Sequence, residues 1–223
     1  MTDRWLSYFE SQGIRDSRWL EAAVMHWGFH EVLYGTIKRH CPPPAKILDV
    51  GSGPGWSDLY LSAMGYDVTG VDSEPALVDT ARDLSSRLGV RATFTTGDAF
   101  DLGLFHGQFD LVYSCGVLEH FDREVTVQLL REQSRCGRYV LIQIPTKYTA
   151  LTGQITDERI YRVAELQGIV RDAGLRVVRT FGYGDITVTP QQIWLRRLLP
   201  RLIWRVAQNL GFAYSIAVLG ERA

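Results

Sequence analysis

Residues 48–55, Leu-Asp-Val-Gly-Ser-Gly-Pro-Gly, place a glycine-rich turn directly after a short apolar, β-rich run and directly before a stretch of helical character. In a parallel α/β sheet, the turn after the first strand lies at the rim of the ligand crevice, where glycine lets the backbone approach a ligand. The spacing is Gly-x-Gly-x-Gly, and Trp56 stands where a dinucleotide fingerprint requires a small residue. No Gly-Lys-Ser/Thr follows, so the turn is not a P-loop either.

Further β-rich runs follow this turn and alternate with helical segments. Such alternation is typical of a parallel sheet covered by helices on both faces, so we expect a doubly wound, Rossmann-like α/β fold. The β-rich runs are 46–51, 67–72, 91–98, 109–116, 139–145, 176–184 and 213–219. We expect helices over 57–64, 75–88, 123–135 and 159–173; Ser73 is the expected cap of the second, and Gly89 its end.

The composition is that of an ordinary globular chain. With 223 residues, of which 46% are hydrophobic and 22% charged, we expect a single domain. Residues 1–40 are predicted to form an N-terminal helical cap and 45–184 the core. Residues 185–211 are predicted to be a helical insertion and 212–223 the last strand.

Charge and cysteine usage narrow the class further. A net charge of -1 gives no overall field for a polyanion, so nucleic acid is not an expected partner. Cys41, Cys115 and Cys136 are too far apart for a disulfide framework or a paired zinc site. The first residues lack a signal-peptide pattern, and no apolar run is long enough to span a bilayer. We therefore expect a cytoplasmic protein.

Two acidic residues end the strands beside the glycine turn. Asp72 closes the second β-rich run, where a carboxylate can accept hydrogen bonds from both hydroxyls of a ribose. Asp98 closes the third run and is placed to accept from an exocyclic amine such as that of adenine. Two acidic groups with no basic one predict a ligand that contains adenosine without phosphates and carries positive charge.

In order and separation, the motifs LDVGSGPG, GVDSEP, GDAFDL and FDLVYSCGVLEHF resemble those of class I S-adenosylmethionine-dependent methyltransferases, especially the group that includes quinone-biosynthesis enzymes. The resemblance covers residues 45–185. It implies seven strands, mostly parallel with an antiparallel last strand, S-adenosylmethionine as cofactor, and methyl transfer to an O, N or C atom of a small molecule. The resemblance also implies which residues bind each part of the cofactor. Gly51, Ser52, Gly53 and Gly55 would flank the methionyl part, and Asp72 and Ser73 would lie at the ribose. Asp98 and Ala99 would meet the adenine, and the backbone of Cys115 would help to hold the amine.

Candidate residues for the acceptor side come from less regular segments. His120 follows the fourth β-rich run and is our first candidate for a general base, with a packing role as the alternative. His26 and His30 are spaced i, i+4 on a candidate helix, but no third ligand is evident and a metal is not expected. We expect them on the inner face of the cap, with His26 as second candidate base and His30 as a substrate contact. Tyr148, after the fifth run, is a further substrate candidate.

The insertion departs from the family pattern, which has a short hairpin there. Residues 194–209, WLRRLLPRLIWRVAQN, are basic and amphipathic. Such a segment either presents a solvated helical face or makes peripheral contact with an anionic membrane, which would suit a lipid-like or quinone acceptor. A non-catalytic S-adenosylmethionine-binding protein and a nicotinamide-dependent oxidoreductase are the remaining alternatives. The sequence predicts neither the acceptor nor the oligomeric state.

Overall fold

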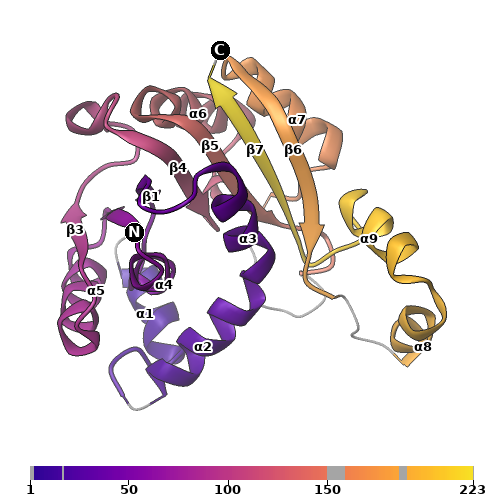
Figure 1. Cartoon of the computed structure of the whole chain (residues 1–223), viewed down its shortest axis with the longest axis horizontal. Coiled ribbons are helices and arrows are strands. Elements are labelled where there is room, and N and C mark those ends of the chain that lie inside the picture. The colour runs from indigo at the N-terminus through magenta and orange to yellow at the C-terminus, as the bar shows by residue number, and fades with distance from the viewer. Residues whose placement is uncertain (1–2, 17, 150–158, 186–189, 223) are drawn as a thin grey trace. The chain divides into compact units, whose positions relative to one another are not determined.

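The structure is a computed structural model that describes residues 3–16, 18–149, 159–185 and 190–222 (Figure 1). Seven strands form one sheet in the order β3-β2-β1-β4-β5-β7-β6. β7 (Ser215–Arg222) lies between β5 (Gly137–Pro145) and β6 (Leu175–Tyr183) and runs antiparallel to β6. This order confirms the expected Rossmann-like sheet with an antiparallel last strand. The chain divides into two compact units, residues 1–115 with 132–140, and 116–131 with 141–223.

The first unit contains the parallel strands β1 (Lys46–Val50), β2 (Asp67–Asp72), β3 (Ala92–Thr96) and β4 (Phe109–Cys115). Helices α4 (Trp56–Ala63) and α5 (Pro75–Leu88) follow β1 and β2, and the 3-10 turn η1 (Gly103–Phe105) precedes β4. Gly89 ends α5 with φ +65°, as expected. The predicted Ser73 cap is wrong: Glu74 precedes the helix, and no side chain caps its first turn.

The N-terminal helices α1 (Asp3–Ser11), α2 (Trp19–Phe29) and α3 (Glu31–His40) form the expected cap. Trp5, Phe9, Trp19 and Trp27 pack against a buried cluster that belongs mainly to α4 and α5. The indole Nε1 of Trp27 also donates a hydrogen bond to the Trp56 carbonyl at 2.6 Å. Burial of large aromatic side chains is a strong stabilising contribution, so these contacts explain how the cap is held on the first unit.

The second unit contains η2 (Leu118–His120), the first part of α6 (Arg123–Cys136) and most of β5. It continues through α7 (Val163–Asp172), β6, α8 (Pro190–Leu198), α9 (Arg201–Asn209) and β7. α7 begins at Val163 rather than at the expected Arg159, because the Arg159 amide donates to the Glu119 carbonyl at 2.8 Å and Arg162, directly before the helix, is extended. Among the described helices, none is long and apolar enough to cross a membrane.

Candidate functional site

The glycine turn after β1 is fixed by backbone hydrogen bonds and by close packing. The amides of Gly51 and Ser52 donate to the Val71 carbonyl at 2.8 and 3.1 Å. Gly55 precedes α4 with φ +74°, and a Cβ there would lie 2.6 Å from the Phe94 ring. The turn therefore requires a left-handed residue without a side chain at position 55. Gly53 is also left-handed at φ +53°, and a Cβ there would lie 3.1 Å from the Phe9 ring.

Asp72 joins the end of β2 to this turn. One carboxylate oxygen accepts a hydrogen bond from the Gly53 amide at 2.8 Å, and the other accepts from the Glu74 amide at 2.9 Å. Burial raises the pKa of Asp72, and the backbone donors oppose that rise. The carboxylate is half-buried and each oxygen has further acceptor capacity. Asp72 can thus orient the turn and accept from a ligand at the same time.

Asp98 and Ala99 lie at the same strand edge as Asp72. β2 pairs with β3 in parallel through Asp72 and Thr96, and the Gly97 amide donates to the Asp72 carbonyl at 3.0 Å. Asp98 is exposed, and its carboxylate accepts from the Phe100 amide at 2.9 Å. Ala99 packs on a buried cluster of the first unit, and Ser73 is exposed beside Asp72. The carboxyl ends of β2 and β3 therefore bring four of the predicted cofactor residues to one edge.

A buried carboxyl pair beneath the turn was not predicted. Asp49 on β1 is opposite Tyr113 on β4, and both are buried together with Asp58 of α4. Burial raises the pKa of Asp49 to about 7, while the Tyr113 hydroxyl and the neighbouring Asp58 carboxyl counteract part of this rise. Burial and the charge of Asp49 raise the pKa of Asp58 well above its usual range. Within the part of the chain that the structure describes, Asp49 Oδ1 has no hydrogen bond of ordinary geometry.

The two cap histidines come together, although not on one helix. α2 ends at Phe29, so the prediction that His26 and His30 share a helix is wrong; His30 is the residue between α2 and α3. Their ring centroids are nevertheless 4.3 Å apart. Burial lowers the pKa of His26 to about 4. The pKa of His30 is also lowered, mainly by burial and to a smaller extent by the neighbouring His26. Both imidazoles are therefore neutral at pH 7.

The cap histidines also face polar groups of the first unit. His26 Nε2 lies 2.9 Å from Ser57 Oγ, which lies 2.9 Å from the Tyr34 hydroxyl. The Cys115 sulfur at the end of β4 lies 3.8 Å from His30 Nε2. These contacts link α2, α3, α4 and β4 through side chains that can donate and accept hydrogen bonds. Among the described residues, no group of three His, Cys, Asp or Glu side chains could hold a metal ion.

His120 and Tyr148 belong to the second unit. His120 ends η2 and is half-buried. Tyr148 follows β5, and its ring packs edge-to-face against Phe212 at 5.0 Å. The Thr149 hydroxyl donates to the Tyr214 carbonyl at 2.7 Å, which ties this turn to the segment before β7. The rest of the loop in which Tyr148 was predicted lies outside the described residues.

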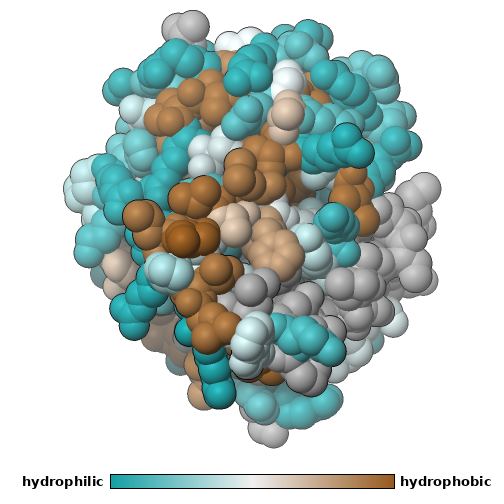
Figure 2. Space-filling model, turned by 90° about the vertical axis from the view of Figure 1, so that its right-hand side faces the viewer, coloured by the Kyte–Doolittle hydropathy of each residue, from teal (hydrophilic) through white to brown (hydrophobic). Residues whose placement is uncertain are grey.

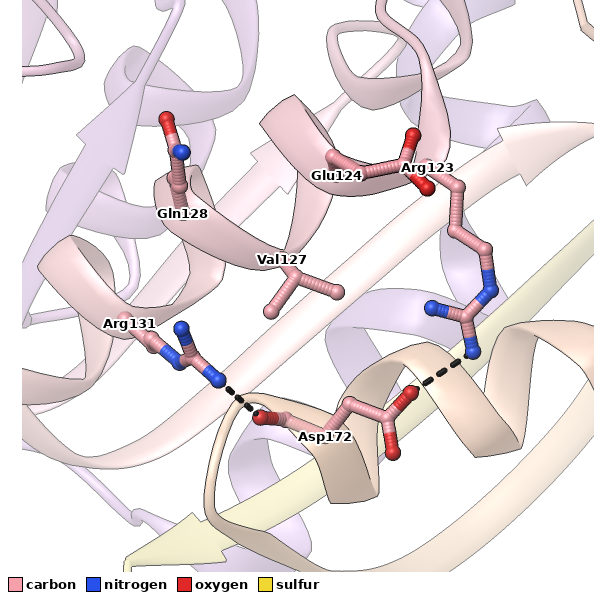
Figure 3. Close-up of a pocket in the computed structure, with 6 residues that line it drawn as sticks. All are labelled: Arg123, Glu124, Val127, Gln128, Arg131 and Asp172. Atoms are coloured by element: carbon pink, nitrogen blue, oxygen red, sulfur yellow. Dashed lines mark hydrogen bonds and ion pairs between the residues drawn. The ribbon is translucent and has the colours of Figure 1, made fainter.

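A recess of about 420 Å³ between α6 and α7 contains none of the predicted site residues (Figure 3). Arg123 pairs with the Asp172 carboxylate at 2.7 Å, and Arg131 donates to the Asp172 carbonyl at 2.8 Å. A cation at the last carbonyls of a helix satisfies them and stabilises the helix dipole. These arginines therefore hold α6 to α7, and the recess follows from that contact.

Comparison with known proteins identifies residues 47–138 as matching the family described as "Methyltransferase domain". The ubiquinone biosynthesis O-methyltransferase of Azorhizobium caulinodans is 36% identical over 75 residues, which are 34% of this chain and 30% of that protein. The chain matches about a third of the length of its curated relatives.

Solved structures share the fold at low sequence identity. The magnesium protoporphyrin IX methyltransferase of Synechocystis, solved with S-adenosylmethionine, has a TM-score of 0.68 at 17% identity, covering 100% of this chain and 93% of that one. The [4+2]-cyclase SpnF has a TM-score of 0.63 at 16% identity, covering 86% and 80% of the two chains. The same fold therefore serves different activities.

Residues 47–138 thus match a methyltransferase domain, and the strand order and the series of motifs agree with the resemblance to class I S-adenosylmethionine-dependent methyltransferases. The resemblance inferred from the motifs is thereby confirmed.

Proposed function

We propose that the chain binds S-adenosylmethionine at the strand edge formed by Asp72, Asp98 and the glycine turn, and transfers its methyl group to a small-molecule acceptor. The observation that carries this proposal is Asp72, whose carboxylate is hydrogen-bonded to the turn while it retains acceptor capacity toward a ligand. A ribose with two free hydroxyls is the ligand group that such a carboxylate suits.

The donor and acceptor groups at this edge fit the cofactor. S-adenosylmethionine, when bound, supplies a methyl group activated by a positively charged sulfur. Asp49, Asp72 and Asp98 are acidic, and Asp49 Oδ1 is a buried oxygen without an ordinary hydrogen bond among the described residues. Buried carboxyl oxygens of this kind are stabilised by a cation or a donor. The set therefore favours a positively charged adenosine compound over a phosphorylated one.

Each predicted cofactor residue has a distinct task. Gly51, Ser52, Gly53 and Gly55 would present backbone to the methionyl part: all three glycines are left-handed, and a Cβ at Gly55 would meet the Phe94 ring. Ser73 would lie beside the ribose, and Ala99 would cover the adenine that Asp98 binds. The backbone of Cys115, at the end of β4, would help to hold the amine. Positioning of both reactants can contribute roughly 7–11 kcal/mol to lowering the barrier, so these contacts do much of what methyl transfer requires.

The acceptor side rests on fewer observations. His120 is our first candidate for a general base because of its place after the fourth strand. His26 ranks second: with a pKa of about 4 it is neutral but binds a proton weakly, which suits hydrogen bonding to an acceptor better than deprotonating one. His30, adjacent to His26, and Tyr148 remain our candidates for substrate contacts.

The proposal is tested by methyl transfer from labelled S-adenosylmethionine to panels of phenols, amines and carbon acids. Transfer to one class, with release of S-adenosylhomocysteine, is the expected result. A protein that binds S-adenosylhomocysteine tightly but transfers no label to any panel would be a binding protein. A protein that binds neither compound would contradict both readings.

A further inference from the structure

The α8–α9 surface, defined here as the exposed side of these two helices, is unusually apolar. Leu202 and Leu210 are 74% and 76% exposed. Figure 2 views this side of the molecule and shows hydrophobic side chains gathered on it. The exposed apolar residues of the surface are Ile193, Trp194, Leu198, Leu202, Ile203, Val206 and Leu210.

The inner side of α9 is fixed by polar and aromatic contacts. Trp204 is buried and its indole Nε1 donates to Asp185 Oδ1 at 2.8 Å. The Gln208 amide donates to the same oxygen at 3.1 Å, and Asn209 Oδ1 accepts from the Gly182 amide at 3.2 Å. These contacts determine how α9 is rotated about its axis. A surface helix normally turns its apolar stripe toward the core, whereas α9 turns Leu202 and Val206 outward, and Leu210 directly after it is exposed as well.

The charge of the same surface has one sign. Residues 190–211 contain four arginines and no acidic residue, although the whole chain has a net charge of -1. Arg196 pairs with Asp185 at 3.4 Å and lies over the Trp204 ring, so it helps to fix α8 against α9. Arg197, Arg201 and Arg205 are exposed beside the apolar residues. An apolar helix face flanked by arginines is complementary to a surface that has anionic groups on the outside and an apolar layer below them.

We propose that the α8–α9 surface binds the face of an anionic phospholipid bilayer, with the helices lying in the plane of the interface. The leucines and Trp194 would enter the boundary between headgroups and acyl chains, and the three exposed arginines would meet the lipid phosphates. A second copy of this chain is a poorer occupant, because a symmetric contact would place like-charged arginine clusters against each other. This inference does not depend on the proposed methyl transfer.

Flotation with vesicles of phosphatidylcholine alone, and of phosphatidylcholine with phosphatidylserine, tests the proposal. We expect the wild-type protein to float with the anionic vesicles, and to bind them much more weakly at about 1 M salt, where the Debye length is only about 3 Å. The double variant Leu202→Glu with Leu210→Glu should bind at least tenfold more weakly. Arg201→Gln and Arg205→Gln should each lower the partition coefficient about fivefold.

Leu104→Glu is the matched control, since Leu104 in η1 is 87% exposed and lies in the other unit. It should float like the wild type, and thermal unfolding of all variants should match because each replaced side chain is exposed. Equal flotation of the Leu202/Leu210 variant and the control would overturn the proposal. So would equal binding to both vesicle types, or a dimer that Leu202→Glu converts to monomers without any vesicle binding. Titration with S-adenosylhomocysteine separates these failures from failure of the proposed function.

Discussion

Replacing Asp72 with asparagine is expected to weaken the binding of S-adenosylhomocysteine by about tenfold to 140-fold. The carboxylate accepts from the Gly53 amide at 2.8 Å and from the Glu74 amide at 2.9 Å. Asparagine has one acceptor oxygen, so its amide nitrogen must face one of these donors, and the negative charge offered to the ribose is lost. The loss of one charge-assisted hydrogen bond costs roughly 1.5–3 kcal/mol, and about 1.4 kcal/mol corresponds to tenfold in the Kd.

Isothermal titration calorimetry of Asp72→Asn measures this effect directly. Asp79→Asn is the matched control, because Asp79 is an exposed carboxylate of α5 paired with Arg82 at 3.0 Å. Such surface pairs contribute little, so the control should bind like the wild type. Thermal unfolding verifies that both variants are folded. If Asp72→Asn retained the affinity of the control, Asp72 would not be a cofactor contact and the assignment of the ribose site would be refuted.

Gly55→Ala should lower the free energy of unfolding by about 2–5 kcal/mol: about 1–2 kcal/mol for the left-handed backbone and about 1–3 kcal/mol for overpacking against Phe94. Gly89→Ala is the control, because Gly89 has φ +65° but open space around it, and it should lose only the backbone cost of about 1–2 kcal/mol. Equal losses of the two variants in urea denaturation would contradict this prediction. The folded pKa of Asp49, about 7, exceeds the usual unfolded value near 4, so the stability of the wild type relative to Asp49→Asn should fall as pH rises from about 4 to about 7. If the free energies of unfolding of the two proteins depended on pH in the same way, the prediction would be refuted. His120→Ala should lower turnover about 10²–10⁴-fold with unchanged affinity for S-adenosylhomocysteine, and unchanged turnover would remove His120 from the mechanism.

The order of strands could be predicted because local signals agreed along the core. Apolar β-rich runs ended at Asp72 and near Asp98, and Gly89 closed a helix by its left-handed conformation. Hydrophobic periodicity and glycine turns depend on near neighbours in the chain, which a sequence displays directly. The edge formed by the glycine turn, Asp72 and Asp98 then followed from the geometry of parallel strands.

The buried carboxyl pair could not be found in this way. Asp49 was part of the quoted motif, but its environment depends on Tyr113 across the sheet and on Asp58 in the first turn of α4. The available signal was an acidic residue inside an otherwise apolar strand. Long-range contacts set its burial and its pKa, so local patterns were insufficient.

The cap and the insertion show two other limits. Gly28 stands directly before Phe29, but α2 runs through it and ends one residue later, so the i, i+4 spacing of His26 and His30 suggested one helix. In the insertion, the amphipathic pattern predicted a helix but not which face would be outward. Trp204 and its contact with Asp185 decide that, and they turn the leucines toward solvent.

The central claim is that this chain binds S-adenosylmethionine at the edge formed by β1, β2 and β3. Calorimetric titration of the purified protein with S-adenosylmethionine and S-adenosylhomocysteine, with NAD as the control, tests it most directly. The account predicts one-to-one binding of the first two compounds and no heat with NAD. Binding of NAD, or silence with all three from protein shown to be folded, would contradict it.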